Sequence, residues 1–278
     1  MKTLKKILAA NILIALLIFT GCDIVHNDYD YDYTPPAPPS NIISITGDNR
    51  VDLTWDHNRE KDLAGYNVYW SYSYDGAYEL IGSTSDNYFI DWDAVNGETY
   101  YYAVTAYDYN GNESELSYDL VYDTPRPEGF NQSIYDYIRF PNNAGYSFSN
   151  YRVVAFNTDM TDFFFENYNG VFYLNVWEDT DIQDMGPTND IWDISWAPDR
   201  GWVPLQPGEN VKYTEAIEGH TYVVWTWDNH YAKVRISLIT PERMVFDWAY
   251  QLVDGNRELK VNNLELRNSI PSAVLKGK

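Results

Sequence analysis

The stretch TYVVWTWDNHYAKVRISL, residues 221–238, decides the fold class of this chain. Apolar and polar residues alternate on both sides of Asp228 and Asn229, which is the period-two pattern of a half-buried β-strand. Asp and Asn tolerate the positive φ of a tight hairpin turn. The stretch therefore predicts two antiparallel strands joined by a two-residue turn.

The register of this hairpin follows from the turn. With Asp228 and Asn229 as the loop, the facing pairs are Trp227 with His230, Trp225 with Ala232, Val223 with Val234, and Thr221 with Ile236. These pairs give one almost wholly apolar face. The opposite, solvated face carries Tyr222, Val224, Thr226, Tyr231, Lys233 and Arg235. Because a slip of one residue would mix the two faces, we expect this register.

Alternation continues through the C-terminal region, residues 126–278. Met244, Phe246, Trp248 and Tyr250 predict a further strand, so we expect an antiparallel sheet folded around a Trp-rich core. The order of features is similar to that of HmuY-like envelope lipoproteins. These features are a Trp192-Asp193-Ile194 strand, the 222–236 hairpin with Tyr231-Ala232-Lys233, and a closing strand FDWAYQ at 246–251. The resemblance implies haem, held between two histidines, as a ligand to consider.

The histidines of the C-terminal region bear on that implication. In the predicted hairpin, His220 and His230 lie about 23 Å apart along the strand, at about 3.3 Å per residue, and on opposite faces. They therefore cannot ligate one haem together. A single axial His230 is the remaining haem hypothesis. A structural role at the hairpin end is the interpretation that we favour, because resemblance of fold does not carry a site.

Residues 38–124 show the same alternation in short segments separated by Gly, Asp and Asn clusters, as in a β-sandwich. The alternating residues are Val51, Leu53 and Trp55, then Tyr66, Val68 and Trp70, then Tyr100, Tyr102, Val104 and Ala106. With the leading Pro38 and Pro39, this pattern resembles a fibronectin type III domain. The resemblance implies a seven-stranded sandwich in which Tyr100 is the tyrosine-corner residue. The expected fold is therefore all-β, a fibronectin type III sandwich followed by a second antiparallel β domain.

The N-terminus, residues 1–21, has the pattern of an export signal. Three lysines precede an apolar run over residues 7–19, which is too short to cross a hydrocarbon layer of about 30 Å. Residues 19–22, Phe-Thr-Gly-Cys, resemble a bacterial lipobox, which implies cleavage after residue 21 and lipid on Cys22. Cys22 is the only cysteine, so no disulfide can form within the chain. Lipidation is the role that we expect for it.

Residues 22–37 follow as a tether. Asp and Tyr alternate over residues 28–33 and prolines come next, a composition that keeps a chain extended. We expect the mature protein to be anchored through lipid on Cys22 in a bacterial cell envelope. The outer membrane or the cell surface is favoured over the inner membrane.

Charge and motif content narrow the function further. The chain has 19 Lys and Arg against 41 Asp and Glu, a formal charge of −22, which repels nucleic acid. It has no Gly-x-Ser-x-Gly elbow, phosphate-binding glycine loop, His-Glu-x-x-His motif or cysteine nucleophile in the mature part. We therefore expect no enzyme, although the paired carboxylates of a glycoside hydrolase need only be close in space.

Tryptophans in the C-terminal region predict a glycan site. Exposed indoles with nearby carboxylates stack on sugars and hydrogen-bond their hydroxyls. Trp192, Trp196 and Trp202 lie in one segment with Pro198 and Gly201, and Trp202 is the better candidate for an exposed ring. Burial in the core is the alternative for these residues.

The densest carboxylate group follows a predicted strand that ends in Trp177. It comprises Glu178, Asp179, Asp181 and Asp184, which are candidate calcium ligands because calcium prefers hard oxygen donors. Their spacing matches no recognised calcium loop, so we favour a solvated acidic loop.

Together these observations favour a lipid-anchored envelope protein that binds or presents a partner without catalysis, with a glycan as the candidate ligand. A haem-binding lipoprotein of the HmuY type and a structural envelope-assembly protein are the alternatives. The sequence predicts no cofactor, and calcium and haem are the two candidate ligands that its residues bring into consideration. The expected partners are a membrane, through lipid on Cys22, and a glycan or an envelope protein, but not nucleic acid.

Overall fold

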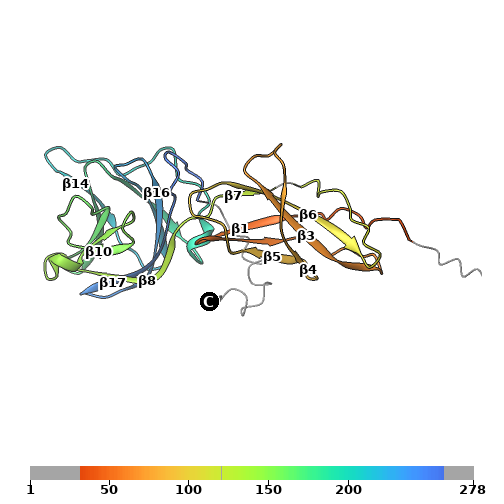
Figure 1. Cartoon of the computed structure of the whole chain (residues 1–278). Helices are drawn as coiled ribbons and strands as arrows, with labels where there is room; N and C mark the ends of the chain where they lie inside the picture. Colours follow the sequence, from red (N-terminus) through yellow and green to blue (C-terminus); the bar gives the residue numbers. More distant parts are fainter. Residues whose placement is uncertain (1–31, 120, 260–278) are drawn as a thin grey trace, which may run out of the picture. The chain divides into compact units, whose positions relative to one another are not determined.

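The computed structural model describes residues 32–119 and 121–259 (Figure 1). Contacts divide the chain into residues 1–34 and residues 35–278, and the elements below belong to the second unit. The predicted signal segment, Cys22 and most of the tether lie outside the described residues, as does the chain after residue 259. Within the described ranges, no helix is long and apolar enough to cross a membrane.

The first domain is a sandwich of two antiparallel sheets. Its strands are β1 (Ile43–Gly47), β2 (Arg50–Thr54), β3 (Leu63–Ser71), β4 (Glu79–Thr84), β5 (Tyr88–Asp91), β6 (Tyr100–Asp108) and β7 (Val121–Asp123). One sheet has the order β1-β2-β5 and the other the order β4-β3-β6-β7. The seven strands, between Ile43 and Asp123, confirm the expected sandwich fold.

Alternate residues of both sheets form the core of the first domain. Val51 and Leu53 of β2 pack with Tyr66 and Val68 of β3, and all four side chains are fully buried. Burial of a large apolar side chain stabilises a fold by about 1.5–3 kcal/mol. The predicted alternating segments are thus confirmed as β2, β3 and β6, with the strand-end Trp70 only half-buried.

Tyr100, the first residue of β6, has the predicted tyrosine-corner contact. Its hydroxyl accepts a hydrogen bond of 3.1 Å from the backbone N–H of Val95, five residues upstream. This bond fixes the connection between β5 and β6, which belong to different sheets.

The C-terminal domain is a second sandwich. Its strands are β8 (Glu128–Tyr135), β9 (Gly145–Ser147), β10 (Arg152–Val154), β11 (Phe163–Tyr168), β12 (Val171–Trp177), β13 (Asp181–Pro187), β14 (Val211–Glu215), β15 (His220–Trp225), β16 (Tyr231–Ile239) and β17 (Arg243–Tyr250). Two short 3₁₀ helices, η1 (Pro141–Asn143) and η2 (Ile191–Asp193), lie between strands.

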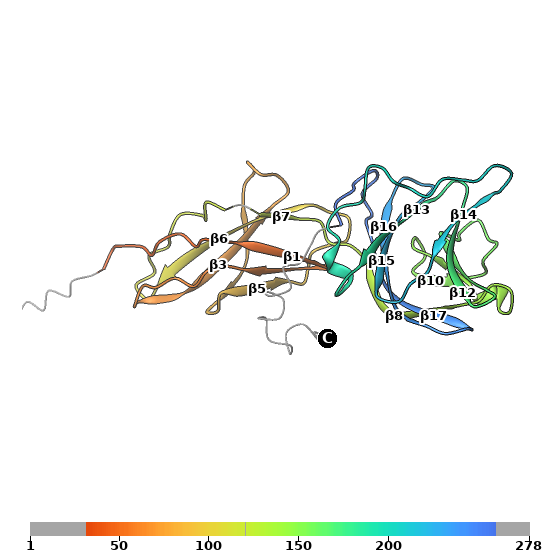
Figure 2. The same ribbon diagram turned by 180° about the vertical axis from the view of Figure 1, so that it is seen from behind.

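These strands form two five-stranded antiparallel sheets, ordered β10-β9-β11-β12-β14 and β13-β15-β16-β17-β8, which lie on opposite sides of the domain (Figure 2). Aromatic rings fill the space between them, for example Phe163 of β11 against Phe246 of β17, with ring centroids 5.3 Å apart. The expected antiparallel sheet is confirmed, and β17 carries Met244, Phe246, Trp248 and Tyr250 into the core. The predicted Trp-rich core is wrong, because among the described residues its rings belong to Phe and Tyr, with Trp248 as the single tryptophan.

The predicted register of the 221–238 hairpin is wrong by one residue. Trp225 lies opposite Tyr231, Val223 opposite Lys233, and Thr221 opposite Arg235. As a result Tyr222 and Val224, not Val223 and Trp225, join Ala232, Val234 and Ile236 in the core between the sheets. A one-residue slip sends every side chain of a strand to the other face.

The turn chemistry explains the shift. The backbone N–H of Thr226 donates to the carbonyl of His230 at 2.9 Å, and Asn229 alone takes the left-handed conformation, with φ of +66°. The Asn229 side chain also accepts a hydrogen bond of 3.0 Å from Nε1 of Trp225. The loop is therefore longer than the two residues expected from Asp228 and Asn229.

The outer face of β15 and β16 is covered rather than solvated. Val223, Tyr231, Ala197 and Leu259 form a second apolar cluster there. Lys233, expected on a wet face, is fully buried, and burial lowers the pKa of its ammonium group well below the ordinary value. Its Nζ donates to the carbonyls of Ile194 and Leu259, at 2.9 and 3.0 Å.

The predicted strand at Trp192-Asp193-Ile194 is also wrong. Residues Ile191–Asp193 form the 3₁₀ helix η2, whose first turn is capped by Asp190 accepting from the backbone N–H of Trp192 at 2.8 Å. An Asp that accepts from the backbone N–H two residues ahead starts a helical turn more readily than a strand.

Candidate functional site

The first domain has a groove at the edge where β4 and β5, edge strands of its two sheets, face each other. We call it the β4–β5 groove. It encloses about 720 Å³, within the range of small-ligand pockets. Its aromatic lining consists of Trp70, Tyr72, Tyr88, Phe89, Trp92 and Tyr100.

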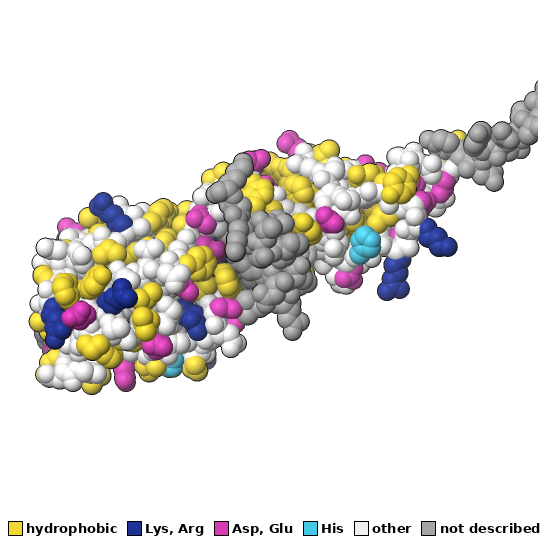
Figure 3. Space-filling model, turned by 90° about the horizontal axis from the view of Figure 1, so that it is seen from below, with side chains coloured by type: hydrophobic (Ala, Val, Ile, Leu, Met, Phe, Trp, Pro, Cys, Tyr) yellow, Lys and Arg dark blue, Asp and Glu magenta, His cyan; other side chains and the backbone are white. Residues whose placement is uncertain are grey.

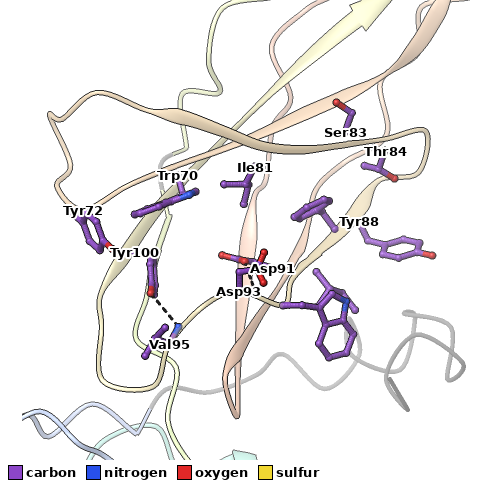
Figure 4. A pocket seen from close by; sticks show the side chains of 13 residues that line it. Trp70, Tyr72, Ile81, Ser83, Thr84, Tyr88, Asp91, Asp93, Val95 and Tyr100 are labelled. Atoms are coloured by element: carbon purple, nitrogen blue, oxygen red, sulfur yellow. Dashed lines mark hydrogen bonds between the residues drawn. The ribbon is translucent and has the colours of Figure 1, made fainter. Parts of the chain in front are cut away.

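Three of these rings form one wall. The Trp70 ring lies edge-on to Tyr72 and Tyr100, with centroids 4.6 and 5.1 Å away. In Figure 4 these three rings lie together, Tyr88 lies on the opposite side, and Asp91 and Asp93 lie between. Tyr72 is 66% exposed and Trp92 48% exposed. The Tyr72 ring is therefore open to solvent, and the Trp92 ring is partly so, because the Arg50 guanidinium lies over it at 5.5 Å from its centroid.

Local sequence explains why the groove floor is aromatic. Gly82 lies in β4, and a Cβ atom there would come within 2.6 Å of the Phe89 ring of β5. The absence of a side chain at Gly82 lets Phe89 lie directly against the backbone of β4. The Tyr100–Val95 bond holds the connection that carries Trp92 and Asp93.

Two carboxylates lie among these rings and differ in their surroundings. Asp91 is buried, and this burial raises its pKa above the ordinary value. One of its oxygens accepts a hydrogen bond of 2.8 Å from the Tyr102 hydroxyl, and the other accepts 3.0 Å from the backbone N–H of Asp93. Asp93 is exposed. Asp91 therefore has a structural role, whereas the carboxylate of Asp93 is accessible to a ligand.

The arrangement suits a polar ligand with apolar faces. Aromatic rings supply flat apolar area, while Asp93, Ser83 and Thr84 supply hydrogen-bonding groups at the rim. A sugar ring has this combination of surfaces. Acidic and hydrophobic side chains lie next to one another at several further places on the face shown in Figure 3.

The sequence-predicted glycan residues are not gathered in one place. Trp192 is half-buried, with its ring 5.9 Å from that of Phe130. Trp202, the expected exposed ring, is instead half-buried against Trp225, at 5.9 Å. Trp196 is the exposed one, at 56%. Within the described part of the chain, no ring contact joins any two of Trp192, Trp196 and Trp202.

The candidate calcium ligands do not converge either. Asp181 pairs with Nζ of Lys212 at 2.7 Å, and Asp184 pairs with Nδ1 of His220 at 2.9 Å. Glu178 and Asp179 are exposed on the connection between β12 and β13. Among the described residues, no three of these four bring their oxygens within 4.8 Å of one another.

His230 has a structural place in the hairpin. Its Nε2 lies 3.1 Å from the carbonyl of Leu252, to which it can only donate, and its Nδ1 lies 3.3 Å from Asp228. The ring also lies 5.6 Å from that of Tyr250. An imidazole that donates from Nε2 does not ligate iron through that nitrogen.

Comparison with known proteins gives partial matches. No family model matches the chain. Over 111 residues it is 38% identical to an amylopullulanase of Thermoanaerobacterium saccharolyticum and 37% identical to one of Thermoanaerobacterium thermosulfurigenes. These alignments cover 40% of this chain but only 8% and 6% of the two enzymes. The chain thus spans a small fraction of the curated relatives it matches.

Two solved structures are similar over 34% of this chain. One is an Fn3-like protein from Clostridium thermocellum, 27% identical with a TM-score of 0.30, all of which is covered. The other is a β-1,2-glucanase from Parabacteroides distasonis, 27% identical with a TM-score of 0.30, of which 13% is covered. Strand order and the tyrosine corner give the first domain its fibronectin type III-like fold.

Proposed function

We propose that this chain is a lipid-anchored envelope protein that binds a glycan, without catalysis, through the β4–β5 groove. The observation that carries the proposal is the exposed rings of Tyr72 and Trp92 in one groove with the open carboxylate of Asp93. The sequence analysis predicted the glycan site on C-terminal tryptophans, and we propose the first domain instead because these groups line one groove there.

The curated relatives support a carbohydrate connection. Both are named amylopullulanase, and each is matched over a small part of its length. We therefore take α-glucan polymers as the first ligands to test and do not transfer the enzymes' activity. Asp91 is buried and accepts hydrogen bonds from the Tyr102 hydroxyl and from the Asp93 backbone, which supports a structural role for this carboxyl group.

Electrophoresis of the full chain in native gels containing amylopectin or pullulan tests glycan binding. The acidic chain migrates readily, and we expect either polysaccharide to retard it. Tyr72→Ala and Trp92→Ala should each weaken binding at least about tenfold, or 1.4 kcal/mol. Tyr118→Ala is the matched control, because Tyr118 is 88% exposed in the same domain and lies outside the groove.

Three outcomes would each contradict a part of this proposal. Retardation that survives both groove substitutions would exclude the groove as the site. The absence of binding to both polysaccharides and to a broad glycan array would exclude a glycan ligand and favour the structural, envelope-assembly role. Release of reducing sugar from either polysaccharide would overturn the non-catalytic part.

Lipid anchoring is supported by the lysines, the apolar run and the Gly21-Cys22 junction of the N-terminus. The intact mass of the native protein tests it. We expect a chain that begins at Cys22 and carries acyl groups, and a Cys22→Ser variant that keeps its signal and carries no acyl group. A native chain that begins at Met1 would contradict the anchor.

A further inference from the structure

The C-terminal domain has a second groove, of about 400 Å³. Two indoles, Trp177 and Trp227, and two carboxylates, Asp159 and Asp179, line it together with Asn157 and Thr158. We call it the indole groove. It belongs to a different domain from the β4–β5 groove, so its occupancy does not depend on the function proposed above.

Three chain connections meet to form the indole groove, and each is fixed by its own hydrogen bonds. In the connection from β10 to β11, the Thr161 hydroxyl donates to the Ala155 carbonyl at 2.7 Å. In the connection from β12 to β13, the backbone N–H of Thr180 donates to the Trp177 carbonyl at 3.0 Å. The β15–β16 turn is closed by the Thr226–His230 bond. The groove is therefore built before any ligand arrives.

Charge in the groove is negative and uncompensated. No lysine or arginine lines it, and none of the ion pairs within the described residues includes Asp159 or Asp179. The negative potential of these carboxylates also reaches a buried group behind the lining. Asp162 is buried next to Thr161, and the charges of Asp228 and Asp179 reinforce the rise in its pKa that burial causes.

The aromatic faces are those that attract cations most strongly. Trp227 is 61% exposed at the tip of the β15–β16 turn, and Trp177 is half-buried with Phe164 5.4 Å behind it. The indole face is the best of the protein rings for a cation, worth about 0.5–1 kcal/mol when exposed and about 2 kcal/mol when desolvated. Carboxylates beside the rings add Coulomb attraction.

We propose that the indole groove binds an organic cation, an alkylammonium or guanidinium group, between its tryptophans and its carboxylates. A bare metal ion does not fit this lining, because indoles supply no ligand atoms and the described carboxylates form no group of three that includes Asp159 or Asp179. A neutral sugar would stack on the rings and hydrogen-bond to the carboxylates, but it would leave their two negative charges without a neutralising cation.

Isothermal titration of the full chain tests the proposal with tetramethylammonium, spermidine and Nα-acetyl-arginine amide as probes. Sodium chloride at equal ionic strength controls for screening, and methyl α-glucoside serves as the neutral probe. We expect saturable binding of at least one cation and none of the glucoside. The three cations separate a quaternary ammonium, a free polyamine and a basic side chain as the source of the group.

Matched variants locate the binding. Trp227→Ala should weaken it roughly tenfold and Asp179→Asn roughly fivefold, whereas Trp196→Ala should leave it unchanged, because Trp196 is similarly exposed in the same domain but lies outside the groove. The Asp179→Asn variant keeps the size of the side chain and the fold, so it still tests whether the cation binds in the indole groove if Trp227→Ala disturbs the turn. Failure of all three cations to bind, binding unaffected by both substitutions, or preference for the glucoside would overturn the proposal.

Discussion

The backbone N–H of Val95 donates to the hydroxyl of Tyr100 across 3.1 Å, and the ring of the same tyrosine forms part of the β4–β5 groove wall. Tyr100 therefore fixes the connection between β5 and β6, and its ring also shapes the groove in which we propose that a glycan binds. Trp70 and Tyr72 both pack on that ring. Stability of the sandwich and geometry of the groove are coupled through this contact.

Tyr100→Phe tests the contribution of the Tyr100–Val95 hydrogen bond to stability while leaving the ring in the groove wall. The ring stays and the hydroxyl acceptor is lost, so we expect the free energy of unfolding to fall by about 1 kcal/mol. Denaturant unfolding measures the change. Tyr72→Phe is the control, because Tyr72 is exposed and its ring remains, and its effect should stay within about 0.5 kcal/mol. Equal effects of the two substitutions would contradict a stabilising role for the corner bond.

Gly82→Val should disturb the groove from below. The added side chain meets the Phe89 ring, which must leave its place against β4. Overpacking of this kind costs about 1–3 kcal/mol of stability, and the displaced ring should also weaken glycan retention. Leu80→Ala, an exposed change in the same strand, should alter neither measurement. Unchanged unfolding of Gly82→Val would show that the close approach has no energetic consequence.

Alternation of apolar and polar residues predicted a strand correctly where one face of that strand is more buried than the other. Met244 and Phe246 alternate with the less buried Val245, and the sequence predicted this strand correctly. The same logic failed for β15, because both of its faces are buried. Tyr222 and Val224 enter the main core, while Val223 joins a second apolar cluster. A strand that is apolar on both faces does not specify register through polarity.

The β4–β5 groove was not predicted because its parts come from both sheets. Trp70 belongs to β3 and Phe89 to β5, and the two come together only when the sheets pack. A partial signal was present in Ile90-Asp91-Trp92-Asp93, which places an aromatic ring between two carboxylates at a strand end. The glycan site was predicted at the C-terminal tryptophans instead, of which Trp192 and Trp202 are half-buried against other rings.

Asn229 holds the turn that overturned the predicted register, and substitutions there test the reason. Its φ of +66° costs about 1–2 kcal/mol for a residue with an ordinary side chain and nothing for glycine. Both Asn229→Ala and Asn229→Gly lose the bond from Trp225 Nε1. Thermal unfolding should therefore place both below the parent, with Ala below Gly by about 1 kcal/mol. The reverse order would show that backbone conformation does not set this turn.

Asp162 makes the stability of the C-terminal domain depend on pH. Burial raises its pKa to about 7, with smaller contributions from the charges of Asp228 and Asp179. The unfolded chain releases this proton near pH 4, whereas the folded chain keeps it until about pH 7. The folded state therefore binds more protons in that window, and stability falls as pH rises, by about 1.4 kcal/mol per pH unit for this group.

Asp162→Asn should remove that dependence. The amide carbonyl can still accept the bond that Asp162 takes from the backbone N–H of Phe148 at 2.7 Å, so the local fold is preserved. Relative to the parent, the variant should gain stability steadily from pH 4 to pH 7 and show no further gain above pH 7. Denaturant unfolding across pH 4–9 measures the two curves, with Asp159→Asn as the exposed control. Parallel curves for parent and Asp162→Asn would mean that Asp162 ionises in the folded chain at its ordinary pKa.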